Sequence, residues 1–170
     1  MKNFIVFAMF TLLVTFASGS GSAQTLVGCT STNLGDPPRV VYQCAGGVVL
    51  EAEAAAALGV LANGPNERPT DVEVSSDAVL IEIAPGSGPF QIRTPHAIAA
   101  VRGTVYAVDV QDGTTSVFVS EGEVTVSRLD GSDQVLLPAG FGVDVSAGEP
   151  VVAREWGAER VARLLSRFGR

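Results

Sequence analysis

The stretch of residues 94–145 constrains the fold more than any other, because apolar and polar side chains alternate along it in short runs. Alternation with a period of two is typical of a β-strand that has one buried face. Asp112-Gly113 and Asp130-Gly131 indicate hairpins, since this dipeptide tolerates the positive backbone angles of a tight turn. Glycines also recur near the ends of the runs, at positions 103, 122, 140, 142 and 148. We therefore predict an all-β body of short strands with glycine corners, built as a short-stranded β-solenoid or a small sandwich.

Three segments of this stretch form an ordered set of motifs. The first opens with Thr94-Pro95-His96 and closes with Val101-Arg102-Gly103-Thr104; the second contains Glu121-Gly122-Glu123-Val124; the third opens with Gly140-Phe141-Gly142-Val143. In this order the segments resemble the FecR domain, and the resemblance tips the choice toward the solenoid-like form. It singles out, as structural or binding positions, Thr94, Pro95, Val101, Arg102, Gly103, Thr104, Glu121, Gly122 and Gly140.

The resemblance also implies a compartment and a kind of partner. FecR-type proteins are bacterial envelope proteins whose periplasmic all-β domain receives a signal from an outer-membrane receptor. The best-known members carry a cytoplasmic anti-sigma segment and one membrane span before this domain. Here the only long apolar segment begins after three residues. We therefore expect a FecR-like domain without those two segments, a non-enzymatic protein-interaction or signalling module whose partner is another envelope protein.

The N-terminus has the layout of a secretory signal peptide over residues 1–23. Lys2 precedes an apolar run at residues 4–17, and small residues follow at 18–23, which is the charge, apolar core and cleavage pattern of such a peptide. The apolar run is shorter than the roughly 20 residues that a membrane-spanning helix needs. We expect cleavage after Ala23, a periplasmic location and no stable span in the mature chain; an uncleaved anchor is the alternative.

The two cysteines, Cys29 and Cys44, admit two interpretations. An exported chain with an even number of cysteines favours a disulfide. A disulfide between them would close a loop of about 16 residues and contribute on the order of 3 kcal/mol in the chain-entropy model. The alternative is a lipoprotein anchored at Cys29, because Leu26-Val27-Gly28-Cys29 matches the lipoprotein-type box.

Further along, the sequence divides into three parts. Residues 24–70 form an N-terminal, disulfide-stapled segment with strands. Within it, residues 48–58 have the composition of a helix, but their apolar and polar residues alternate as in a strand. We favour the strand. Residues 71–152 form the FecR-like β domain. Residues 153–170 form an amphipathic helix, since Trp156 and four later apolar residues fall at helical spacing. We expect it to cap the β body; docking on a partner or an anionic membrane is the alternative.

Charge argues against nucleic acid as a partner. The whole chain has 18 acidic residues against 11 basic ones, and the basic residues concentrate from Arg154 onward. The acidic body that precedes them would repel phosphate groups.

Reactive groups are sparse, so we expect no cofactor, metal or catalytic residue. His96 is the only histidine and cannot build a multi-histidine metal site. Glu121 and Glu123 flank Gly122 and could serve glycosidic chemistry, although a glycine corner explains them more simply. Arg102 follows an apolar run, so we expect it to be partly buried and paired with Glu121. Two rival functions remain, a carbohydrate- or cell-wall-binding module and a polysaccharide-acting enzyme.

Overall fold

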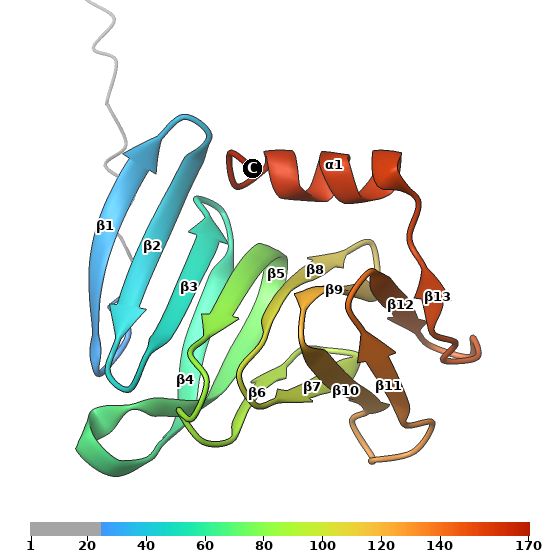
Figure 1. Ribbon diagram of the computed structural model, residues 1–170, viewed down its shortest axis with the longest axis horizontal. Helices are drawn as coiled ribbons and strands as arrows, with labels where there is room; N and C mark the ends of the chain where they lie inside the picture. The colour runs from blue at the N-terminus through green and yellow to red at the C-terminus, as the bar shows by residue number, and fades with distance from the viewer. Residues whose placement is uncertain (1–24) are drawn as a thin grey trace, which may run out of the picture.

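The computed structural model describes residues 25–170 (Figure 1). The expected signal peptide at residues 1–23 lies outside these residues. The described chain folds into 13 strands that form one curled, open sheet, followed by a single C-terminal helix. The prediction of an all-β fold with a C-terminal helix is confirmed. None of the described residues belongs to a helix that is long and apolar enough to cross a membrane.

The elements follow one another with short connections. The strands are β1 (Cys29–Gly35), β2 (Pro38–Cys44), β3 (Val48–Glu53), β4 (Ala57–Asn63), β5 (Pro69–Ile83), β6 (Phe90–Arg93), β7 (Ala97–Val101), β8 (Val105–Gln111), β9 (Thr114–Glu121), β10 (Glu123–Arg128), β11 (Val135–Pro138), β12 (Phe141–Ser146) and β13 (Arg154–Glu155). A 3₁₀ turn, η1 (Pro65–Glu67), precedes β5, and helix α1 (Ala158–Ser166) ends the chain.

The long strand β5 belongs to both halves of the curled sheet. Its second half pairs with β3 and β8, and its first half pairs with β4 and β6. Asp77 lies between the halves with a φ of 60°, which extended backbone does not adopt, so the strand bends there. We name the half ordered β1-β2-β3-β5-β8-β9-β12-β13 sheet I, and the half ordered β4-β5-β6-β7-β10-β11 sheet II.

The apolar core lies between the two sheets. Alternate side chains of each strand point inward, as the pleat requires, including Leu50, Ile81 and Tyr106 from sheet I and Ile92 and Val124 from sheet II. All five are fully buried or nearly so. The face-to-face arrangement resembles a sandwich whose two layers share β5.

Helix α1 covers the outer face of sheet I (Figure 1). Leu164 and Phe168 pack there against Leu80 and Phe118 from β5 and β9. Sheet I is therefore apolar on both faces at this point. Because both faces of β5 are buried there, its residues are continuously apolar from residue 78 to residue 81. The helix is shorter than the range 153–170 expected from the sequence, and Trp156 lies just before it.

Several local predictions can be compared with the structure. The preference for strand over helix at residues 48–58 is confirmed, although a turn divides the segment between β3 and β4. Asp112-Gly113 forms the tight hairpin between β8 and β9 with both φ angles positive, and Asp130-Gly131 lies in the longer β10–β11 hairpin. The disulfide between Cys29 and Cys44 is present and joins β1 to β2. The boundary drawn at residue 70 falls inside β5 and stays a prediction.

Candidate functional site

The FecR-type motifs meet at a corner where the chain passes between the two sheets. Gly103 and Thr104 connect β7 of sheet II to β8 of sheet I, and Gly122 connects β9 back to β10. Thr104 is 3% exposed, and its hydroxyl donates a hydrogen bond to the carbonyl of Glu123 at 3.1 Å. Its backbone also exchanges hydrogen bonds with Ile83 of β5. The two crossing points of the chain are thus tied to each other and to β5.

Glycine is required at these crossings for two reasons. Gly103 and Gly122 have φ angles of 66° and 82°, which lie in a region that residues other than glycine rarely adopt. A Cβ atom on Gly122 would also lie 3.0 Å from the Thr104 hydroxyl and 3.1 Å from the Gly103 carbonyl. The motif therefore encodes a close crossing of two connections rather than a reactive group.

A second motif residue, Thr94, closes the turn between β6 and β7. Its hydroxyl accepts hydrogen bonds from the amides of His96 and Ala97 and lies 2.8 Å from the hydroxyl of Thr115. Both threonines are buried. Pro95 is exposed at the tip of the turn. This network holds sheet II against β9 of sheet I, so Thr94 has a structural role.

The expected burial and pairing of Arg102 are wrong. Val101 points into the core, and because side chains alternate along a strand, Arg102 points into solvent. Glu121 is also exposed, and no ion pair joins it to Arg102 in the part of the chain that the structure describes. Gly140, with a φ of 85°, turns the chain between β11 and β12, and its carbonyl accepts a hydrogen bond from the amide of Trp156.

A groove of about 840 Å³ lies on the outer face of sheet II. One row of directly paired residues forms its floor, running across six strands from Ala62 through Asp71, Gln91, Ala100 and Thr125 to Leu136. Ala100 lies near the middle of this row, and its small side chain leaves the groove open at this point. The crossing corner supplies one wall, from Val101, Arg102, Gly103, Gly122 and Glu123. We call this feature the sheet II groove.

The sheet II groove carries unpaired charge. One oxygen of Asp71 accepts a hydrogen bond from the Gln91 amide at 2.6 Å and lies 3.6 Å from Arg93. The other oxygen is buried and has no hydrogen-bond partner. Arg102 and Glu123 lie at the wall with exposed side chains. A ligand that brings an acceptor for Arg102 and a donor for Glu123 would pair the two accessible charges at the wall.

Sequence reasoning found the wall of this groove and missed its floor. The motif residues Val101, Arg102, Gly103 and Gly122 all line it. The alternation along each strand could have identified each floor residue as one that faces outward. Their alignment into one row depends on the register between strands, which the sequence does not reveal.

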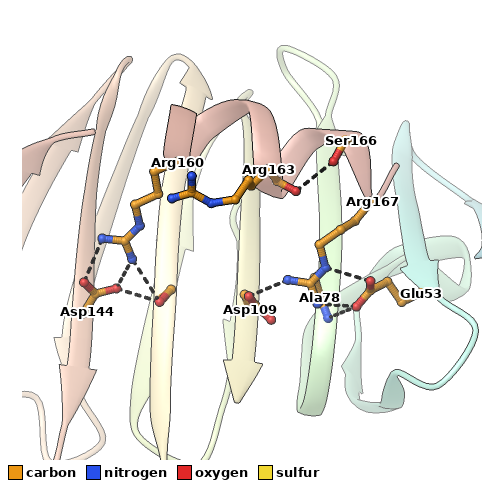
Figure 2. Close-up of polar contacts among 9 residues, drawn as sticks. Glu53, Ala78, Asp109, Asp144, Arg160, Arg163, Ser166 and Arg167 are labelled. Carbon is orange, nitrogen blue, oxygen red and sulfur yellow. Dashed lines mark hydrogen bonds and ion pairs between the residues drawn. The ribbon is translucent and has the colours of Figure 1, made fainter. Parts of the chain in front are cut away.

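A second polar cluster holds helix α1 on sheet I (Figure 2). The Arg167 guanidinium donates hydrogen bonds to Glu53 at 2.7 Å and to Asp109 at 2.6 Å. Arg160 binds Asp144 with two hydrogen bonds. Arg163 lies between these arginines, and among the described residues its guanidinium makes only a 3.9 Å contact, with Glu159 on the same helix. We call Arg160, Arg167 and their carboxylate partners the helix salt-bridge network.

Electrostatics within the network follow from these contacts. Burial alone would raise the pKa of Glu53, but the hydrogen bonds from Arg167 and the Ala78 amide, with the charge of Arg167, lower it overall. The pKa of Asp144 is lowered in the same way, because Arg160 and Ser116 outweigh its burial. The hydrogen bond to Glu53 raises the pKa of Arg167, with Asp109 adding to this effect. These ion pairs stabilise the docked helix.

Trp156 completes the attachment of the helix. Its ring stacks on Phe118 at a centroid distance of 5.3 Å, and the Arg160 guanidinium lies over the Trp156 ring, 3.4 Å from its centre. Gly142 makes this possible, because a Cβ atom there would lie 2.3 Å from the indole. These contacts occupy Trp156, Arg160 and Arg167 within the protein, which favours the capping role of the helix over docking on a partner.

The residues considered for catalysis, His96, Glu121 and Glu123, lie in a structural hydrogen-bond network or at the exposed crossing corner. The Nδ1 atom of His96 lies 3.1 Å from the hydroxyl of Thr115, which is fully buried and bonded to Thr94. Glu121 and Glu123 are both exposed and flank the glycine at the crossing corner. No three metal-ligating side chains cluster within residues 25–170.

Comparison with known proteins gives the family. The chain matches the family model of the FecR protein over residues 35–125, more than half of its length. The chain belongs to the FecR family. The matched range contains the crossing corner and most of the groove floor. Membership supports a non-catalytic module with a signalling-related role, and it confirms the resemblance read from the motifs.

Solved structures agree with the fold. Two crystal structures of a protein from Parabacteroides distasonis ATCC 8503, described as an anti-sigma factor, align with TM-scores of 0.51 and 0.52 at 20% identity. Each alignment covers 84% of this chain and 63% of the other. The chain thus spans less than two thirds of the length of that protein. At this identity the likeness shows a shared fold. No curated protein matches the chain.

Proposed function

We propose that this FecR-family chain is an exported, non-enzymatic module that works in the periplasm by binding another envelope protein. The observation that carries the proposal is the sheet II groove, whose wall is built by the family's own motif corner. Helix α1 covers the outer face of sheet I, whereas no element of the described chain covers the outer face of sheet II. Sheet II is therefore the face that is available to a partner.

The chemistry of the groove suits a protein ligand. Its floor mixes a carboxylate, an amide and a hydroxyl with the exposed side chain of Leu136, and its wall adds Arg102 and Glu123. Protein-binding surfaces combine an apolar anchor with polar groups at the rim in this way. Aromatic platforms, on which glycans stack, are absent from the residues that line the groove apart from the buried Phe90. The glycan-binding alternative therefore ranks second.

The state of Cys29 bears on how the exported chain is held. Its sulfur forms the disulfide with Cys44, and a sulfur in a disulfide cannot also carry a lipid thioether. A disulfide between β1 and β2 also fits the oxidising periplasm. We therefore propose a periplasmic chain that is not anchored through Cys29.

A photo-crosslinking residue in the groove tests the proposal. It is introduced at Leu136, which is 56% exposed in the groove, and as a control at Leu129, which is 47% exposed in the β10–β11 loop outside the groove. The full chain is expressed in its native bacterium and irradiated in living cells. We expect position 136, and not position 129, to capture one defined envelope protein, which mass spectrometry identifies.

A second step separates specific binding from proximity. The captured protein is purified and titrated against the wild-type chain and against Arg102→Ala, a substitution of an exposed residue that should not alter folding. We expect weaker binding by the variant. Capture of cell-wall fragments, equal capture from both positions, or affinity unchanged by Arg102→Ala would each overturn the proposal and favour a glycan-binding or structural role.

A further inference from the structure

Four strands lie at open edges of the described sheet: β1, β4, β11 and β13. Open edges invite pairing with other chains, and natural proteins protect them with bulges, charges, prolines or short length. β13 has two residues, both charged. β11 has four residues and ends in a proline. β4 is interrupted by three shifts in its register with β5. Three of the four edges are therefore protected.

Strand β1 has none of these protections. Its seven residues, Cys29–Gly35, contain no charge and no proline. Its register with β2 is unbroken from the pair Cys29–Cys44 to the pair Gly35–Pro38. All of its residues after Cys29 are exposed. The disulfide fixes one end to β2, so the edge does not fray there.

The backbone of β1 presents hydrogen-bonding groups outward at defined positions. The amide of Ala45 donates to the carbonyl of Gly28 at 3.0 Å, which makes these residues a hydrogen-bonded pair. Hydrogen-bonded and non-hydrogen-bonded pairs alternate along an antiparallel ladder. Thr32 therefore bonds to β2, whereas Ser31 and Asn33 direct their amide and carbonyl groups away from β2.

We propose that β1 pairs with β1 of a second copy of this chain, antiparallel about a two-fold axis at Thr32. Thr32 is the midpoint of the strand, so this register pairs all seven residues of β1. Ser31 of one copy then lies opposite Asn33 of the other, and their outward groups exchange hydrogen bonds on both sides of the axis. The two Thr32 residues face each other as a non-hydrogen-bonded pair.

Charge favours this edge over other surfaces as the place where two copies meet. The chain carries a net charge of −7, so most contacts between two copies bring like charges together. In the proposed register only neutral side chains lie opposite one another, and Asp36 lies beyond the end of β1. Because a seven-residue strand pair buries less than the roughly 1,200 Å² of a stable interface, the dimer should be weak and dependent on concentration.

Engineered cysteines test the register. In a non-hydrogen-bonded pair the Cα atoms lie about 4.5 Å apart, which a disulfide can span. Thr32→Cys should therefore form a disulfide-linked dimer on mild oxidation of the exported, purified chain. In Asn33→Cys, the two new cysteines are offset by two residues, about 7 Å along the strand, and should not join. Peptide mapping confirms that the bond between Cys29 and Cys44 is intact.

Sedimentation velocity over a range of protein concentrations tests the dimer itself. We expect the mass to double at high concentration for the wild type and for Ala139→Asp, which adds the same charge at an exposed turn. We expect Thr32→Asp to remain monomeric, because it places two like charges at the axis. A wild type that stays monomeric, a Thr32→Asp variant that still dimerises, or Asn33→Cys crosslinking as fast as Thr32→Cys would overturn the proposal. None of these results depends on the sheet II groove.

Discussion

Replacing Arg167 with alanine should loosen helix α1 from sheet I, because Arg167 connects the helix to two strands at once. Its guanidinium binds Glu53 at the end of β3 and Asp109 on β8 (Figure 2). The side chains of Arg167, Glu53 and Asp109 are 24%, 21% and 19% exposed. The ion pairs of Arg167 are therefore neither fully exposed nor fully buried. Removing Arg167 leaves the carboxylates of Glu53 and Asp109 without the guanidinium that both of them bind.

The size of the effect follows from this intermediate burial. Exposed ion pairs contribute about 0.2–1 kcal/mol, and removing one partner of a fully buried pair costs about 3–5 kcal/mol. We expect Arg167→Ala to lower the free energy of unfolding by about 2 kcal/mol, between these limits. For a domain of this size, about 2 kcal/mol corresponds to a decrease in Tm of roughly 4–8 °C.

The dependence on pH gives an independent test of the same reasoning. The pKa of Glu53 is lower in the folded chain than in the unfolded chain. Its contribution to stability is therefore present above the unfolded pKa, near about 4.3, and is lost as the pH falls through the folded pKa. The difference in Tm between the wild type and Arg167→Ala should be largest near neutral pH and should shrink toward about pH 3.

The assay is thermal unfolding followed by circular dichroism, with Arg163→Ala as the matched control. Arg163 lies on the same helix, and its side chain is 71% exposed. Its guanidinium has only the 3.9 Å contact with Glu159 among the described residues, so removing this side chain should not shift Tm measurably. Equal Tm values for the two variants would show that Arg167 makes no net contribution. A difference that is constant with pH would show that any contribution does not come from the Glu53 carboxylate.

Three further substitutions test other parts of the structure. Gly142→Ala should lower stability by about 1–3 kcal/mol through overpacking and shift the fluorescence of Trp156, the only tryptophan; an unchanged spectrum would contradict the close packing. Tyr106→Phe should raise stability by about 1 kcal/mol in urea unfolding, because it removes a buried hydroxyl without a partner, and a loss of stability would indicate an unseen partner. Replacing Cys29 and Cys44 together by serine should cost on the order of 3 kcal/mol, and a smaller loss would mean that β1 is held by its ladder alone.

The local features of this fold were readable from the sequence because they depend on neighbouring residues. Alternation identified the strands of residues 94–145, and Asp112-Gly113 identified a tight hairpin by its backbone requirement alone. The helix was recognised from the spacing of residues such as Leu164 and Phe168, which do face sheet I. Cys29 and Cys44 were paired correctly because no other cysteine competes.

Features that depend on register or on distant contacts were not readable. The burial of Arg102 was expected from the apolar run before it, although alternation from the buried Val101 places it outside. Trp156 was assigned to the helix, but the helix begins at Ala158 and Trp156 packs against Gly142 on a strand fourteen residues earlier. The floor of the sheet II groove combines one residue from each of six strands, and only the pairing between strands brings them into line.

The motif corner and the groove floor have separable roles, and this separation bears on how a binding module of this family could acquire specificity. Gly103, Thr104 and Gly122 are held by backbone geometry and by contacts with one another, so changing them disturbs the crossing between the sheets. Gln91 and Thr125 point outward from strands whose inward neighbours form the core, so they can change without altering the packing. Under the proposed function, the motif sets the position of the groove wall, and the outward residues of sheet II determine which partner fits.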